Sequence, residues 1–93
     1  MKFIVTFSWG ADKEKRDEGI ARFQKTGGQP PAGARLMGRW TCLDMSGGFV
    51  LLESDDPKAL TQFALDWSDL MELTIVPVLE DQELSEVLQR AGG

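Results

Sequence analysis

Residues 34–54, ARLMGRWTCLDMSGGFVLLES, give the strongest indication of the fold. Residues 34–42 and 48–54 predict two β-strands, and the turn-rich residues 44–47 between them predict a hairpin with a loop of several residues. The segments on either side of this hairpin decide which kind of sheet it joins.

The residues before the hairpin predict a strand and then a helix. Apolar and mostly polar residues alternate over 2–9, with Phe3, Val5, Phe7 and Trp9 on one side, which is typical of a strand. Asp12 is suited to cap a helix over about 12–25, and Gly27-Gly28 predicts its end.

The residues after the hairpin predict a helix, a strand and a second helix. Asp55-Asp56-Pro57 is a helix start, because an aspartate caps free amides and proline lacks only a donor that the first turn does not use. Helical spacing of apolar residues then continues to about residue 68. A two-residue period returns from Met71 to Leu79, and residues 81–90 predict a short last helix.

The order β-α-β-β-α-β, with an added terminal helix, predicts a single ferredoxin-like α+β domain over residues 1–93. In this split βαβ arrangement an antiparallel sheet has its helices on one face, and the second and fourth strands are edges. Pro77 agrees with an edge position for the last strand, because a missing donor breaks no ladder there.

The face of the sheet without helices is predicted to be apolar. Ile4, Val76 and Val78 point to it, together with either Val50 and Leu52 or Phe49 and Leu51, depending on which alternate residues face outward. A monomer rarely exposes such a surface, so we expect a homodimer that packs two sheets face to face. A chain of 93 residues also buries a smaller share of its surface than larger domains do.

Composition argues against several classes of function. Residues 1–40 carry a net charge of +4 and residues 41–93 a net charge of −9, which gives −5 overall and disfavours nucleic-acid binding. The sequence has no histidine, tyrosine or asparagine and a single cysteine, Cys42. No Ser-His-Asp or Cys-His machinery and no metal-ligand spacing is therefore available, and we predict no cofactor and no metal.

The first residues do not have the pattern of a targeting segment. Residues 3–7 form an apolar run that is too short for a signal peptide and far too short to cross a membrane. Together with the lone cysteine, this predicts a cytoplasmic protein without membrane association.

Three segments carry a resemblance to a known family: residues 33–40 (GARLMGRW), residues 48–57 (GFVLLESDDP), and Trp67-Ser68-Asp69-Leu70 followed by residues 75–79 (IVPVL). Their spacing resembles the uncharacterised domain-of-unknown-function family 3303, over Met1 to about Glu83. The resemblance implies a ferredoxin-like, dimeric α+β-barrel protein and implies no established activity.

Candidate ligand-binding residues are Arg39, Trp40, Trp9, Trp67 and Ser8. The arginine can grip a carboxylate through paired donors, while the indoles line a cleft between sheet and helices and the hydroxyl adds a hydrogen bond. The other interpretation is structural: Arg39 pairs with Glu53 across the hairpin or with a dimer mate, and the indoles pack in the core or an interface.

Glu53 follows an apolar strand, and a carboxylate removed from water has a raised pKa that suits a general base. Structural pairing with a cation is the alternative. The hairpin register decides whether Glu53 and Arg39 share a face, and the sequence leaves that register open.

Two functions are consistent with these residues. The favoured hypothesis is a homodimer that binds a small, partly apolar or acidic molecule between sheet and helices. The alternative is an enzyme similar to the cofactor-independent oxygenases or isomerases of the dimeric α+β-barrel type, with Glu53 as base and Arg39 steadying an anion. The alternative rests on fold analogy, and whether the protein is an enzyme stays open.

Overall fold

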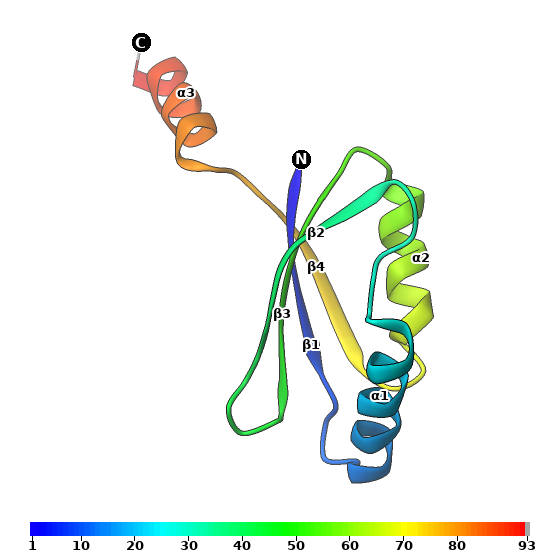
Figure 1. The fold of residues 1–93 in the computed structure, drawn as a ribbon. Helices are drawn as coiled ribbons and strands as arrows, with labels where there is room; N and C mark the ends of the chain where they lie inside the picture. Colours follow the sequence, from blue (N-terminus) through cyan, green and yellow to red (C-terminus); the bar gives the residue numbers. More distant parts are fainter. Residues whose placement is uncertain (93) are drawn as a thin grey trace.

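The computed structural model describes residues 1–92, which form one antiparallel sheet and three helices (Figure 1). The elements in chain order are β1 (Lys2–Ser8), α1 (Lys13–Thr26), β2 (Ala34–Thr41), β3 (Gly47–Ser54), α2 (Pro57–Trp67), β4 (Glu72–Val78) and α3 (Asp81–Gly92). The strand order is β2-β3-β1-β4, so β2 and β4 are the edges. The α+β, ferredoxin-like prediction is confirmed, and Pro77 lies on an edge strand as expected.

The helices begin and end where the local chemistry predicts. The Asp12 carboxylate accepts the amides of Glu14 and Lys15, and Gly27 ends α1 in the left-handed conformation. Asp56 caps α2 by accepting the amide of Lys58, with Pro57 in the first turn. Each cap satisfies backbone groups that a helix end leaves unpaired, which fixes where the chain turns back towards the sheet.

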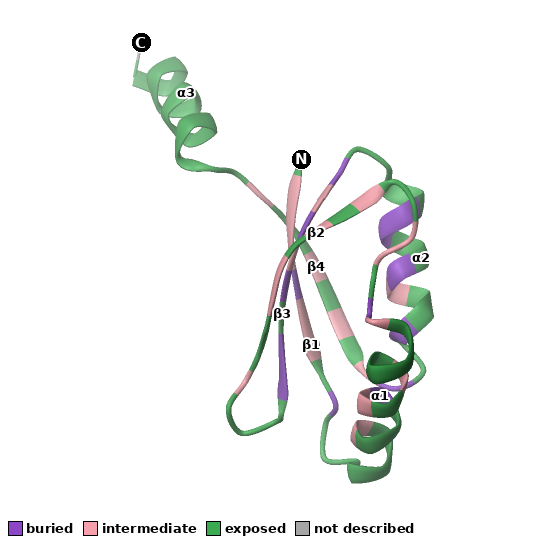
Figure 2. Cartoon of the chain, viewed as in Figure 1, coloured by how far each residue is buried: buried purple, intermediate pink, exposed green. Residues whose placement is uncertain are grey.

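One face of the sheet is covered by α1 and α2, and the core lies beneath α2 (Figures 1 and 2). Val5 and Leu52 are fully buried there, and both extend from the central strands. The buried side chains that pack into one cluster are Val5, Val50, Leu52, Leu60, Phe63 and Trp67, and Trp9, Ala59 and Leu70 are buried as well. The helix α1 has Gly19 as its one buried residue within the described chain. The helix α1 therefore has little buried surface of its own.

The opposite face, which we call the open face, has no helix over it. The strand register places Ile4 between Leu51 and Val76, and Phe49 beside Trp40. The register therefore selects Phe49 and Leu51, rather than Val50 and Leu52, as the outward pair. Phe49, Val76 and Trp40 are exposed in the single chain.

The last helix, α3, stands away from the sheet and the other helices (Figure 1). None of its described residues is buried, as the uniform green of α3 in Figure 2 shows. Among residues 1–92, no helix combines the length and the apolar character needed to cross a bilayer.

Candidate functional site

A β-bulge in β2 determines which side chains face the helices. Leu36 pairs with Leu52, but the next pair along the strand is Gly38 with Leu51, so Met37 is an extra residue. An extra residue reverses the alternation of the side chains that follow. Arg39 consequently lies on the helix-covered face opposite Val50.

Arg39 reaches from β2 to the end of α1. Its guanidinium donates to the carbonyl oxygens of Gly28 at 2.9 Å and Gly27 at 3.1 Å. It also lies over the ring of Phe23, at 4.5 Å from the ring centroid. Burial lowers the pKa of Arg39, although an arginine keeps its charge at any physiological pH. A half-buried cation is thus held at the helix C-terminus, where the helix dipole partly compensates it.

The site requires glycine at position 28. Gly28 has a φ of +61°, and a Cβ atom added there would lie 2.6 Å from Nη1 of Arg39 and 3.0 Å from the ring of Phe23. The missing side chain is what lets the guanidinium approach the backbone carbonyl.

Trp9 supports α1 at its middle. A Cβ atom on Gly19 would lie 2.2 Å from Cζ3 of Trp9, so the benzene edge of the indole rests directly against the helix backbone. Phe7 meets the same indole edge-on, with ring centroids 5.8 Å apart. The indole therefore acts as a spacer between the end of β1 and α1.

Arg22 links α1 to the end of α2. It donates two hydrogen bonds to the carboxylate of Asp69, at 2.9 Å and 2.8 Å, and one to the carbonyl oxygen of Asp66 at 2.7 Å. Its guanidinium also lies 5.5 Å from the ring centroid of Trp67. Together with Arg39 and Trp9, this contact holds α1 at three points along its length.

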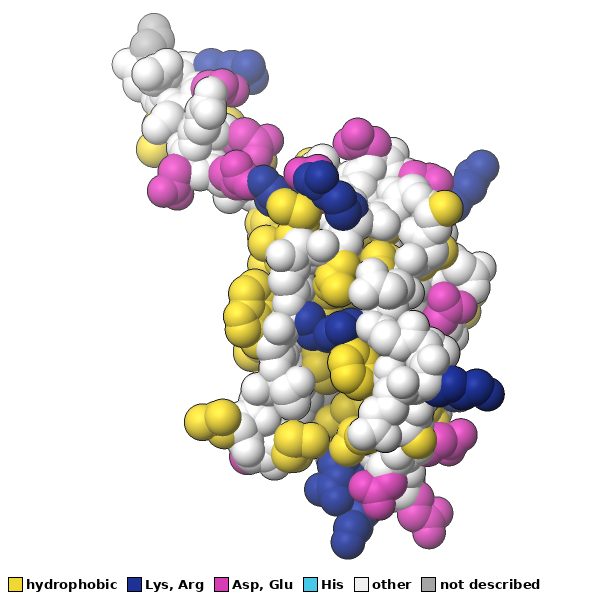
Figure 3. All heavy atoms as spheres, in the orientation of Figure 1, with side chains coloured by type: hydrophobic (Ala, Val, Ile, Leu, Met, Phe, Trp, Pro, Cys, Tyr) yellow, Lys and Arg dark blue, Asp and Glu magenta, His cyan; other side chains and the backbone are white. Residues whose placement is uncertain are grey.

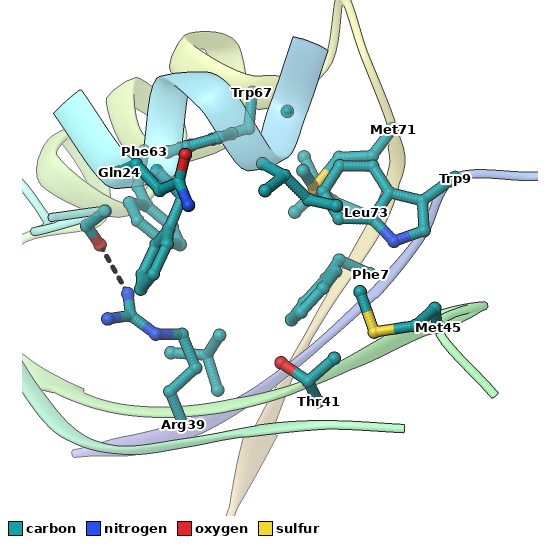
Figure 4. Close-up of a pocket in the computed structure, with 15 residues that line it drawn as sticks. Phe7, Trp9, Gln24, Arg39, Thr41, Met45, Phe63, Trp67, Met71 and Leu73 are labelled. Carbon is teal, nitrogen blue, oxygen red and sulfur yellow. Dashed lines mark hydrogen bonds between the residues drawn. The ribbon is translucent and has the colours of Figure 1, made fainter. Parts of the chain in front are cut away.

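A cavity of about 370 Å³ lies under α1, between that helix, α2 and the sheet. Figure 3 shows hydrophobic side chains gathered in the hollow between the hairpin strands and the helices, with basic atoms among them. The lining residues labelled in Figure 4 are Phe7, Trp9, Gln24, Arg39, Thr41, Met45, Phe63, Trp67, Met71 and Leu73. The volume of this cavity and its mostly apolar lining are typical of sites that bind small molecules.

The polar groups of the cavity come from different sides. In Figure 4, Arg39 and Trp9 lie on opposite sides, and Gln24 points between them from α1. The indole nitrogen Nε1 of Trp9 is buried and has no hydrogen-bond partner in the described chain. It lies on the edge of the ring nearest Met45 and Phe7 (Figure 4). A buried donor without a partner is uncommon in proteins.

Three of the five predicted ligand-binding residues line this cavity, namely Arg39, Trp9 and Trp67. Trp40 does not: the bulge turns it to the open face, where 57% of it is exposed. Ser8 also lies elsewhere, because its position on β1 faces away from the helices and its Oγ accepts the amide of Gly10. The expectation that both would line the cleft is wrong.

Glu53 and Arg39 lie on opposite faces of the sheet. The Glu53 carboxylate accepts a hydrogen bond from Arg35 at 2.7 Å, and Lys2 lies 3.9 Å away. Glu53 is therefore paired with a cation, as the structural interpretation proposed, although the cation is Arg35 rather than Arg39. The residues that line the cavity include no carboxylate, so the catalytic hypothesis has lost its general base.

Sequence reasoning missed several lining residues. Gln24, Thr41 and Met45 lie on a charged helix, a strand end and a turn, where no pattern distinguishes them from solvent-facing residues. In the part of the chain that the structure describes, no three acidic or cysteine residues gather as they would around a metal ion.

The fold and the cavity define the class of protein: a small ferredoxin-like α+β domain with a mostly apolar cavity between its sheet and first helix. A family model described as Domain of unknown function (DUF3303) matches residues 1–92, and the chain belongs to this family. No curated protein and no solved structure matches the chain.

Proposed function

We propose that the protein binds a small, partly apolar carboxylic acid in the cavity under α1, and that it works as a homodimer joined through the open faces. The observation that carries the binding proposal is Arg39, a half-buried cation on the wall of an apolar cavity. Its hydrogen bonds go to carbonyl oxygens, and within residues 1–92 no carboxylate pairs with it.

An anionic ligand suits this arrangement for an electrostatic reason. A desolvated charge gains from a counter-ion, and the helix C-terminus supplies only about half an opposite charge. Two carbonyl contacts leave further N–H groups of the guanidinium free to donate. The rings of Phe7, Phe63 and Trp67 offer apolar walls for the body of the ligand.

The dimer proposal depends on the apolar residues of the open face. Ile4, Leu51 and Val76 lie side by side across β1, β3 and β4, and Phe49 extends the same surface. Sheets with one face left apolar are ordinarily covered, because contiguous exposed apolar surface favours association.

A screen with paired ligands tests the binding proposal. The probes are 2-naphthoate, indole-3-acetate and decanoate, each beside its uncharged primary amide, with thermal stability and tryptophan fluorescence as readouts. At least one acid is expected to raise the melting temperature, while its amide raises it much less. Equal effects of acid and amide, or no effect from any acid, would contradict the proposal.

Two arginine variants make the test specific to the site. Arg39→Met should weaken binding of the acid about tenfold to a hundredfold, because a charge-assisted hydrogen bond contributes about 1.5–3 kcal/mol. Arg35→Met is the matched control, since Arg35 lies on the open face beside Glu53. Arg39→Lys keeps the charge but loses the planar guanidinium, so its affinity for the acid should lie between those of Arg39→Met and Arg35→Met.

A further inference from the structure

The helix α3 has an apolar stripe with nothing against it. Leu84, Val87 and Leu88 recur at helical spacing and expose 45%, 47% and 60% of their surface. A helix of 12 residues is only marginally stable in water on its own, and most helices depend on packing of such a stripe. The stripe therefore needs a surface to cover it.

The chain's own sheet does not provide that surface. The root of α3 is fixed by Glu80, which forms an ion pair with Lys2 and whose amide donates to Glu83 at 3.2 Å. Only two residues separate the end of β4 from the first residue of α3. These contacts direct α3 past the end of the sheet, as Figure 1 shows.

The chain exposes more surface than a compact monomer of its size. The chain exposes 6450 Å², whereas a compact monomer of this mass exposes about 5,400 Å². Its radius of gyration is 15.4 Å, against about 12 Å for a compact domain of this length. The excess of roughly 1,000 Å² matches the ~800 Å² that each partner of a standard interface buries.

The second unmatched apolar surface is a pair on the open face. Trp40 and Phe49 are cross-strand neighbours that expose 57% and 47% of their surface. Phe49 pairs with Thr6 of β1, whereas α3 starts beside Lys2, four residues away, which is about 13 Å along the strand. The stripe and the pair thus lie at opposite ends of one sheet, and α3 points away from the pair.

We propose that α3 is an exchanged arm, whose stripe packs across Trp40 and Phe49 of a second copy of this chain. A two-fold axis near the Lys2 ends of the strands sets the open faces together with antiparallel strands, and it lets α3 of each copy, which begins past the end of its own sheet, lie over Trp40 and Phe49 of the other. The contact is then made twice, as an isologous interface requires. At about 1.5 Å per residue, α3 is about 18 Å long, which is enough to cross two strands.

The inference rests on the homodimer in the proposed function, and it adds which surfaces meet. Sedimentation velocity gives the first test, with Leu84→Ser/Leu88→Ser on the stripe and Gln82→Ser/Gln89→Ser on the opposite side of α3 as the matched control. The stripe variant should weaken the dimer at least tenfold, and the control should leave it unchanged. An equal dissociation constant of the dimer in both variants would overturn the inference.

A mixed-label experiment shows which chain the arm touches. Chains with a spin label at Ser85→Cys, in a Cys42→Ser background and without isotope, are mixed with ¹⁵N-labelled Cys42→Ser chains. In the ¹⁵N NMR spectrum of this sample, the spin label weakens only signals from the other copy, because the label and the isotope are on different chains. The Trp40 indole N–H, assigned with Trp40→Phe, should lose the most intensity of the three indole signals.

The outcomes distinguish failure of the exchanged arm from failure of the homodimer. A dimer in which the Trp40 signal is not weakened overturns the exchanged arm and leaves the dimer standing, with α3 placed elsewhere. A chain that sediments as a monomer at micromolar concentration overturns both the dimer and the arm. Binding of acids in the cavity is measured separately and is unaffected by either result.

Discussion

The Arg22 guanidinium and the Asp69 carboxylate form a bidentate pair, with hydrogen bonds of 2.8 Å and 2.9 Å that tie α1 to the segment after α2. Because α1 has little buried surface of its own, this pair is one of the few contacts that hold α1 over the cavity.

The pair predicts a pH dependence of stability. The hydrogen bonds from Arg22 lower the pKa of Asp69, so the stabilisation is fully present above the unfolded pKa of about 3.9 and is lost as the pH falls through the lower folded value. Urea unfolding of wild type and Asp69→Asn from pH 2 to 6 should show an advantage of the wild type above about pH 4 that disappears in acid. A constant difference across this range would contradict the assignment, and Glu86→Gln on α3 is the control.

Gly19→Ala should destabilise the protein. Alanine is ordinarily better than glycine inside a helix by about 1 kcal/mol, but here the new Cβ atom would collide with the Trp9 ring. Overpacking of this kind costs about 1–3 kcal/mol. Gly92→Ala at the end of α3 has open space around it and should be neutral or slightly stabilising in the same urea titration. Stabilisation by Gly19→Ala would show that Trp9 does not rest on α1.

Gly27 and Gly28 provide a matched pair of variants at the end of α1. Both have a positive φ, so alanine at either position costs about 1–2 kcal/mol in backbone strain. Only at Gly28 would the added Cβ also meet the Arg39 guanidinium. Gly28→Ala should therefore lose more stability than Gly27→Ala, and it should also weaken binding of a carboxylate in the cavity.

Equal losses of stability in the two variants, with unchanged ligand affinity, would mean that the contact between Arg39 and Gly28 contributes nothing. Isothermal titration with the best acid from the screen supplies the affinity, and circular dichroism confirms that each variant is folded.

Ser54→Ala should destabilise the protein by about 1–3 kcal/mol, because it removes two hydrogen bonds that each contribute about 0.5–1.5 kcal/mol. The buried Oγ donates to the carbonyl oxygen of Gly33 at 2.6 Å and accepts the amide of Asp56 at 2.9 Å. Ser68→Ala, at the exposed end of α2, should change the free energy of unfolding by less than about 0.5 kcal/mol. A loss of similar size in both variants would contradict the role of Ser54.

The fold was accessible from the sequence because local signals and the global arrangement agree. Asp12, Gly27 and Asp56 each mark a helix end through a cap that needs no tertiary information. The alternation in β1 and β4 gave the correct faces for Val5 and Val76, since neither strand has an irregularity in its register.

The site was only partly accessible, for one physical reason. The bulge at Met37 reverses the faces of the residues after it, and nothing in the spacing of residues 34–41 announces an inserted residue. Simple alternation puts Arg35 and Arg39 on one face, whereas the structure separates them. As a result Arg39 lines the cavity, whereas Trp40, which was expected to line it, does not.

The same bulge has a consequence for how the protein avoids aggregation. Edge strands invite further strands to add to a sheet, and fibres grow in that way. One edge, β2, is made irregular by Met37, and the other, β4, carries Pro77, which offers no N–H to an incoming strand. The addition of further strands is therefore hindered at both edges of the sheet.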